Sequence, residues 1–249
     1  MTETLLREWG DHDVLTLTIN RPERRNAVDP VLLSALAETL HTDGERAGAV
    51  VLRGAGDGAF CAGYDLSRLT GTAADLEADH FIGEAVAAIS DCPAPVIARL
   101  SGHCHGAGVE LALTCDLRVA APSLRMSVPA VSLGVVYRYQ FVARLVVMVG
   151  LARASTLLLG MEELNLGGAG GWGLVNFQAA QSELDARTRE VAEKLAQAPR
   201  AAVRGTKASL NLLVARAIDE RDLARSQELR ADAYSSPERK EALNRRRKR

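Results

Sequence analysis

Two short glycine-containing segments could each present a free main-chain amide to a cavity. In residues 60–66, FCAGYDL, Gly63 precedes an expected helix start, so the amide of Tyr64 is left without a helical partner. In residues 106–110, GAGVE, the amide of Ala107 is left free in the same way, and the helix dipole adds positive potential. Two such amides would stabilise an oxygen atom that becomes negatively charged during a reaction. Either segment alone would indicate only a packed turn, whereas the pair indicates an oxyanion hole.

Two other glycine-rich segments invite a nucleotide-binding interpretation that their context does not support. Residues 54–59, GAGDGA, follow an expected strand that is not the first of the fold, and no helix follows at once. Residues 168–173, GAGGWG, lead into residues 174–177, which resemble a strand rather than a helix. We therefore interpret both segments as loops in which the backbone turns tightly.

The histidines and cysteines do not form a convincing metal site. His103 and His105 could chelate a metal, but no acidic or thiol set stands at ligand spacing, so we favour a pair of loop residues that line a pocket and expect no metal. The cysteines have no CxxC spacing, and we expect reduced thiols in the core or near the site. They are Cys61, Cys92, Cys104 and Cys115.

Strands that alternate with helices would position these residues. Apolar and β-branched runs predict strands over residues 14–19, 49–53, 95–100, 116–120 and 125–128. Apolar periodicity predicts helices over residues 31–41, 75–90 and 106–113, and an almost wholly helical chain from Gln140 onward, including residues 184–197, 201–213 and 218–234. This order indicates an α/β fold with a mainly parallel, layered core and a boundary near residues 185–200.

Composition limits the class of ligand. A chain of 249 residues with 47% hydrophobic residues can bury a full core, and a formal net charge of −1 gives no reason to expect nucleic acid or membrane as a partner. No apolar stretch has the length of a signal peptide or a membrane span, so we expect a cytoplasmic protein that binds a small molecule. The basic run at residues 245–249 is either a solvated helix end or a segment for localisation or an anionic partner.

Taken together, the ordered motifs resemble the enoyl-coenzyme A hydratase/isomerase (crotonase) superfamily over nearly the whole chain. The matching pieces are residues 20–27 (NRPERRNA), 60–66 (FCAGYDL), 101–112 (SGHCHGAGVELA), 115–120 (CDLRVA), 133–134 (LG) and 173–176 (GLVN). The resemblance implies a crotonase-type spiral of ββα units over residues 1–195 and a C-terminal helical trimerisation region over residues 196–249. It also implies a homotrimer or homohexamer.

The resemblance further implies an acyl-coenzyme A thioester as the substrate and no cofactor beyond the coenzyme A that the substrate carries. The thioester oxygen would be held by the amides of Tyr64 and Ala107. Lys207 either meets a coenzyme A phosphate or is an ordinary surface lysine. Coenzyme A would lie beside residues matching Arg25, Ala27, Ala62, Gly63, Asp65 and Leu66.

The chain departs from the hydratases of this superfamily at one catalytic position. Hydratases use two glutamates, one at the position of Glu110 and one where this chain has Ala130. A methyl group cannot transfer a proton, and a positioned proton-transfer group is typically worth about 10²–10⁴-fold in rate. Hydration by the paired route should therefore be badly impaired.

The segment of residues 126–137 is similar instead to methylmalonyl-coenzyme A decarboxylase, a relative that carries a tyrosine at the position of Tyr137. That relative has a histidine where Tyr64 stands. Tyr137 would hold a substrate carboxylate out of the thioester plane, and Arg138 would attract it. Glu110 would be either a proton donor or a buried support. The remaining pocket residues would be His103, Pro129, Ala130 and Leu133.

The expected function is the decarboxylation of a malonyl-type or methylmalonyl-type coenzyme A thioester through an enolate. One alternative is an enoyl-coenzyme A hydratase, isomerase or carbon–carbon lyase that uses Glu110 alone on a specialised thioester. Another is a trimer that binds acyl-coenzyme A without catalysis. The sequence leaves open the acyl group and whether a carrier protein replaces coenzyme A.

Overall fold

The computed structural model describes residues 3–247 and contains a six-stranded sheet in the order β1-β2-β3-β5-β7-β10. β1 (Leu5–Trp9) pairs antiparallel with β2 (Val14–Ile19), and every other pairing in this sheet is parallel. The remaining strands are β3 (Ala49–Gly54), β5 (Val96–Leu100), β7 (Leu117–Ala120) and β10 (Phe177–Gln178). The parallel pairing predicted from the alternation of strands and helices is confirmed.

A second sheet of four short strands continues the strands of the first. β4 (Ala59–Cys61), β6 (His103–His105) and β8 (Arg125–Ser127) follow β3, β5 and β7 along the chain, and β9 (Leu164–Asn165) closes the order β4-β6-β8-β9. Three consecutive segments of the chain, β3-β4, β5-β6 and β7-β8, therefore each contribute one strand to the large sheet and one to the small sheet before the next helix. This confirms the predicted crotonase-type spiral of ββα units.

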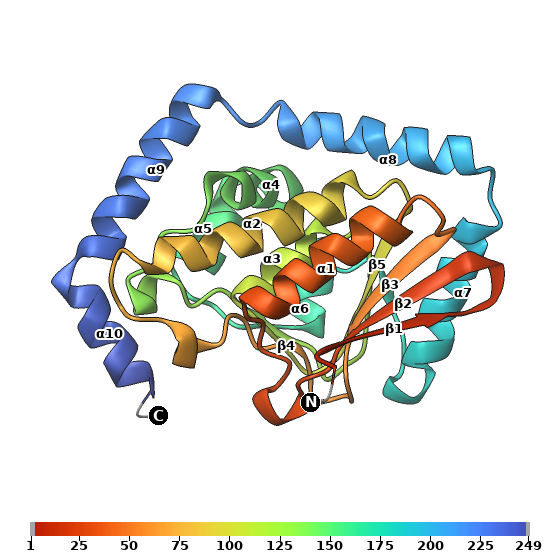
Figure 1. Cartoon of the computed structure of the whole chain (residues 1–249), viewed down its shortest axis with the longest axis horizontal. Helices are drawn as coiled ribbons and strands as arrows, with labels where there is room; N and C mark the ends of the chain where they lie inside the picture. The colour runs from red at the N-terminus through yellow and green to blue at the C-terminus, as the bar shows by residue number, and fades with distance from the viewer. Residues whose placement is uncertain (1–2, 248–249) are drawn as a thin grey trace.

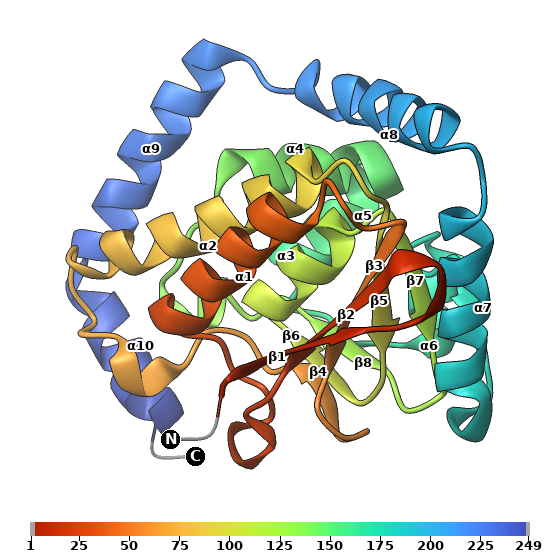
Figure 2. The same ribbon diagram turned by 45° about the vertical axis from the view of Figure 1, so that its right-hand side comes forward.

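Helices cover both faces of the large sheet (Figures 1 and 2). α1 (Pro30–Asp43), α2 (Asp75–Asp91) and α3 (Ala107–Thr114) lie on one face, and α7 (Leu184–Ala196) lies on the other. Neighbouring side chains in β3 point to opposite faces, so Leu52 packs with the first group and Val51 with α7. All eight residues of α3 are buried, which fixes the start of this helix within the core.

The chain after residue 138 is largely helical, as predicted. α4 (Tyr139–Val149), α5 (Leu151–Leu158) and α6 (Leu166–Gly171) pack near the core. α8 (Arg200–Ala215), α9 (Glu220–Ser235) and α10 (Pro237–Arg247) then run around the outside, and α9 and α10 return beside the end of α2 (Figures 1 and 2). Of the basic run, residues 245–247 belong to α10, and residues 248–249 lie outside the described part of the chain.

Some local predictions were wrong. Gly168 and Gly170 do not form a turn but lie inside α6, which Asn165 caps by accepting a hydrogen bond from the amide of Gly168 at 3.0 Å. The strand expected at residues 174–177 is confined to Phe177 and Gln178. Between residues 3 and 247, no helix is long and apolar enough to cross a membrane.

Candidate active site

A cavity lies where the ends of the short strands meet α2, α3 and the C-terminal helices. Most of the residues singled out from the sequence line it. They are Arg25, Ala62, Gly63, Tyr64, Leu66, Ala107, Glu110, Pro129, Ala130, Leu133 and Tyr137. Four other residues from the same set, Ala27, Asp65, His103 and Arg138, do not line it.

A backbone bridge orients the amide of Tyr64. The amide of Val28 donates to the carbonyl of Gly63 at 2.9 Å, and the amide of Asp65 donates to the carbonyl of Val28 at 2.8 Å. Because successive residues of a paired strand direct their polar groups to opposite sides, the amide of Tyr64 faces away from Val28. Among the residues described, this amide has no backbone acceptor.

The amide of Ala107 is the first of α3 and has no intrahelical acceptor. Gly106, with φ +54°, makes the turn that precedes it and donates its own amide to the carbonyl of Ser127 at 2.9 Å. A β-carbon at Gly63 would lie only 3.7 Å from the Ala107 nitrogen. The two segments therefore adjoin in one cavity.

Glu110 reaches the same cavity from the first turn of α3. Its residue is 2% exposed, and its carboxylate forms an ion pair with the guanidinium of Arg138. Burial raises the pKa of Glu110, and the charge of Arg138 opposes that rise. The expectation that Arg138 attracts a substrate carboxylate is not matched by its position, because the arginine lies behind Glu110 and outside the cavity wall.

Tyr137 presents its hydroxyl to the cavity. Its ring packs against Phe141 with centroids 5.0 Å apart, and its oxygen would be 3.5 Å from a β-carbon at Gly106. Burial, with the nearby charge of Glu110, raises the pKa of Tyr137 well above its usual value, so the hydroxyl keeps its proton. Within residues 3–247 it has no hydrogen-bond partner of its own, which leaves it available to a ligand.

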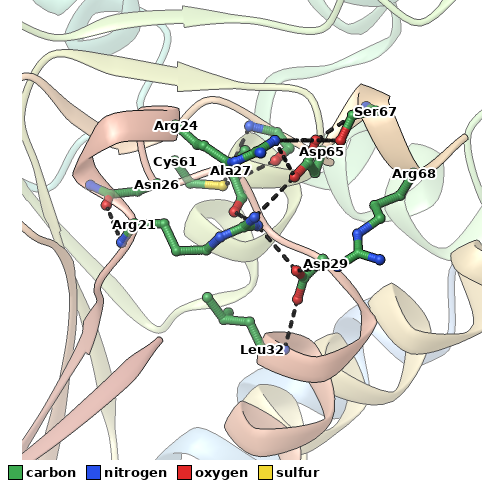
Figure 3. A network of polar contacts seen from close by, with 11 residues as sticks. Arg21, Arg24, Asn26, Ala27, Asp29, Leu32, Cys61, Asp65, Ser67 and Arg68 are labelled. Carbon is green, nitrogen blue, oxygen red and sulfur yellow. Dashed lines mark hydrogen bonds and ion pairs between the residues drawn. The ribbon is translucent and has the colours of Figure 1, made fainter. Parts of the chain in front are cut away.

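Asp65, expected beside coenzyme A, instead belongs to a buried network (Figure 3). Its carboxylate pairs with Arg21 at 3.0 Å and Arg24 at 3.1 Å, and it accepts from the Ser67 hydroxyl at 2.7 Å. Although burial works in the other direction, these contacts lower the pKa of Asp65. Asp65 therefore fixes the loop that carries Tyr64 and Leu66, and Arg21 also donates to the carbonyl of Ala27 at 2.7 Å.

His105, rather than His103, lines the cavity. The Nε2 atom of His105 lies 3.0 Å from Nδ1 of His103, and its Nδ1 atom lies 2.8 Å from the Ser127 hydroxyl. Burial and the neighbouring His103 lower the pKa of His105. No group of three or more metal-ligating side chains occurs in the described part of the chain.

Lys207 does not face a ligand site in this chain. It is 6% exposed, and its Nζ atom lies 3.0 Å from the carbonyls of Ile89 and Ala94 and 2.8 Å from the Asp116 carboxylate. An ammonium group has three protons, and these contacts use all of them. Neither alternative given for Lys207, a coenzyme A phosphate contact or an ordinary surface lysine, matches this buried position, and Lys207 ties α8 to the core.

Sequence reasoning missed the residues that α2 and the C-terminal helices bring to the cavity. Asp75 and Asp79 lie one helical turn apart on α2, and Asp75 pairs with Arg239 of α10, as Asp79 does with Arg230 of α9. The i, i+4 spacing of the two aspartates predicts that they share one face of the helix. No local sequence pattern predicts their arginine partners, which are more than 150 residues away. The other lining residues that were missed are Leu69, Ala78, Ile82, Val135, Tyr234, Arg239 and Arg246, whereas His105 had been expected to line a pocket.

Comparison with known proteins agrees with this geometry. Residues 10–249 match the family model described as enoyl-CoA hydratase/isomerase. The chain is 36% identical over 180 residues to a probable enoyl-CoA hydratase (echA6) of Mycobacterium bovis, covering 72% of each protein. It is 31% identical over 229 residues to a crotonyl-CoA hydratase of Syntrophomonas wolfei, covering 90% of this chain and 86% of that one.

The fold is also shared with a solved structure of methylmalonyl-CoA decarboxylase in complex with 2-nitronate-propionyl-CoA. The TM-score is 0.90 with 22% identity, covering all of this chain and 96% of that one, a likeness that concerns the fold alone. The chain belongs to the enoyl-CoA hydratase/isomerase family, and it is an acyl-CoA-processing enzyme of the crotonase type.

Proposed function

We propose that this enzyme decarboxylates a malonyl-type coenzyme A thioester by stabilising the resulting enolate. The observation that carries the proposal is the unpartnered Tyr137 hydroxyl beside Gly106, in a cavity whose wall at Ala130 has a methyl group in place of a second carboxylate. A hydroxyl that keeps its proton can donate to a substrate carboxylate, and the methyl group does not repel that carboxylate.

The chemistry needs one bond to break and one proton to arrive. The carbon–carbon bond to the substrate carboxylate breaks, carbon dioxide leaves, and the bonding electrons move onto the thioester oxygen as an enolate. The amides of Tyr64 and Ala107 donate to this oxygen, and loss of one such donor elsewhere costs about 10²–10³-fold in rate. The α-carbon then takes a proton that originates in solvent.

Of the two roles expected for Glu110, the ion pair with Arg138 favours support over proton donation. The guanidinium of Arg138 favours the ionised form of this carboxylate and occupies one of its oxygens, although burial raises its pKa. Its position in the first turn of α3 also places negative charge where the helix dipole is favourable, which stabilises the helix start that presents Ala107.

The mouth of the cavity suits the phosphates of coenzyme A. Arg25 and Arg246 line it, and neither has an ion-pair partner among the described residues. Guanidinium groups bind phosphate oxygens with charge-assisted hydrogen bonds. A trimer or hexamer is the assembly that we propose with this function, and the exposed Leu210, Leu212 and Leu213 on α8 supply apolar surface for it.

Hydration or isomerisation of an enoyl thioester is the second candidate. It is favoured by Asp79, a second carboxylate that lines the cavity with Glu110, and by the printed names of the curated relatives. Asp79 is held by Arg230, so this route requires the aspartate to leave its partner or to act while paired.

Product mass separates the candidates. Malonyl-, methylmalonyl- and crotonyl-coenzyme A would each be incubated with the enzyme and followed by mass spectrometry, with Glu110→Gln in parallel. Loss of carbon dioxide from the first two supports decarboxylation, whereas gain of water or a shifted double bond in the third supports the second candidate. Thermal stabilisation by all three thioesters without any turnover would contradict both and indicate a protein that only binds acyl-coenzyme A.

A further inference from the structure

Within residues 3–247, every carboxylate that lines the cavity has an arginine partner from a later part of the chain. Two of the partners lie in α10 and α9, and the third is the residue that precedes α4. The pairs are Asp75 with Arg239, Asp79 with Arg230, and Glu110 with Arg138. The wall of the cavity therefore contains carboxylates, but among the described residues each of them is neutralised by an arginine.

Of these partners, Arg138 pairs with the carboxylate that lies on α3, the helix that begins at Ala107. Its side chain is 12% exposed and reaches Glu110 from outside the cavity, along a groove that it lines with Asp79 and Arg230. α2 makes room for it, because a β-carbon at Gly83 would lie 2.6 Å from its Nη1 atom. Its buried Nε atom has no acceptor among the described residues. The guanidinium thus contacts Glu110 and does not line the cavity.

A substrate carboxylate held by Tyr137 would lie close to Glu110, since the Tyr137 hydroxyl lies beside Gly106, whose carbonyl accepts from the amide of Glu110 at 3.3 Å, and both side chains line the cavity. Two uncompensated carboxylates at such a distance repel each other strongly in a site that excludes water. A paired carboxylate and guanidinium carry no net charge and repel a third anion far less.

We propose that Arg138 is a specificity-determining residue that lets the cavity accept an acyl group bearing its own carboxylate. It does so by cancelling the charge of Glu110 from behind the cavity wall. This inference rests on the proposed function for the identity of the substrate, but it concerns binding and not the chemical step. Arg138 is a positioning residue in this account, because it acts through Glu110 and touches no substrate atom.

The test measures binding of two unreactive ligands that differ by one carboxylate. They are the propyl thioether of coenzyme A and its 2-carboxyethyl counterpart, and calorimetry gives the Kd of each. Arg138→Gln should weaken binding of the carboxylated ligand at least about tenfold, equal to about 1.4 kcal/mol, and leave the propyl ligand within about twofold. Arg138→Lys, which keeps the charge, should bind both as the parent does.

Two further variants keep the test decisive. Arg187→Gln is the control, because Arg187 pairs with Glu190 at 2.6 Å on the surface of α7 and does not contact Glu110. The double variant Glu110→Gln with Arg138→Gln removes both charges, avoids a lone buried carboxylate, and should restore binding of the carboxylated ligand.

An equal loss for both ligands, no loss for either, or no recovery in the double variant would overturn the proposal. Absence of carbon dioxide release from malonyl-type thioesters would overturn the proposed function instead. The two failures are distinguishable, because the thioethers cannot react.

Discussion

Gly63 lies against the amide of Ala107, so that a β-carbon at position 63 would be 3.7 Å from the Ala107 nitrogen and 3.0 Å from the carbonyl oxygen of His105. Gly63 also has φ +100°, a conformation that side chains rarely adopt. This contact joins the two segments that present free amides, although Gly63 and Ala107 are 44 positions apart in the sequence.

Gly63→Ala should therefore abolish turnover. The added methyl group must push the two segments apart, which moves both amides away from a shared carbonyl oxygen, and the backbone strain should lower the free energy of unfolding by about 1–2 kcal/mol. Gly56→Ala is the control, because Gly56 also has positive φ, +69°, but a β-carbon there meets no atom within 4 Å. Equal turnover in the two variants, measured at equal stability, would contradict the placement of the oxyanion hole.

Tyr137→Phe should lower kcat for a malonyl-type thioester about 10²-fold, because the site loses the hydroxyl that orients the carboxylate in this account. The fold should persist, since the ring keeps its contact with Phe141. Tyr139→Phe is the matched control: its hydroxyl donates to Asp222 at 2.9 Å on the surface. Parent-like kinetics for Tyr137→Phe would remove Tyr137 from the mechanism.

Arg246→Gln should raise KM for coenzyme A thioesters about tenfold without changing kcat, because a phosphate contact at the cavity mouth contributes equally before and during the reaction. The effect should shrink as salt is added. Arg245→Gln serves as the comparison, since Arg245 is exposed and lies near Glu241 on the surface of α10. A change in kcat alone would indicate that Arg246 shapes the site rather than binds phosphate.

Asp75→Asn should destabilise the fold by about 3–5 kcal/mol at pH 7, because it leaves the buried Arg239 without its partner. Although burial opposes it, hydrogen bonds from Thr70 and Gly71 and the contact with Arg239 lower the pKa of Asp75 below 3.8. A lowered folded-state pKa gives stability that is present above pH 3.8 and lost as the pH falls through the folded pKa.

The difference in Tm between parent and Asp75→Asn should therefore be large at pH 7 and smaller near pH 3. Asp222→Asn, at an exposed position, should show little difference at either pH. A difference between the parent and Asp75→Asn that stays constant across this range would show that the carboxylate contributes through its shape and not through its charge.

The sequence predicted the elements well where the apolar pattern was long, as in α1, α2 and the helices after residue 184. It missed β1, β4, β6 and β9, and the last three have three residues or fewer, which is too short for a detectable period. The strand expected at residues 174–177 overlaps β10 only at Phe177. Gly168 and Gly170 were placed in a turn since glycine is a poor helix former, but the Asn165 cap and the buried Ala169 hold them in α6.

For the candidate site, motifs identified the residues that lie near one another in sequence or after short strands. Glu110 and Tyr137 were chosen through the family resemblance, whereas the direction of the Arg138 side chain could not be predicted, because it depends on the space that Gly83 leaves in α2. The role of Arg239 could not be predicted for a different reason. Its contact with Asp75 forms only because α10 returns to the core. Long-range partners of this kind carry no local signal.

Decarboxylation in deuterium oxide tests the central claim most directly. If an enolate forms on the amides of Tyr64 and Ala107, malonyl-coenzyme A should lose carbon dioxide and gain one deuterium at the α-carbon, as read by mass spectrometry of the product. Malonyl-coenzyme A recovered unchanged by an enzyme that hydrates crotonyl-coenzyme A in the same buffer would contradict the account.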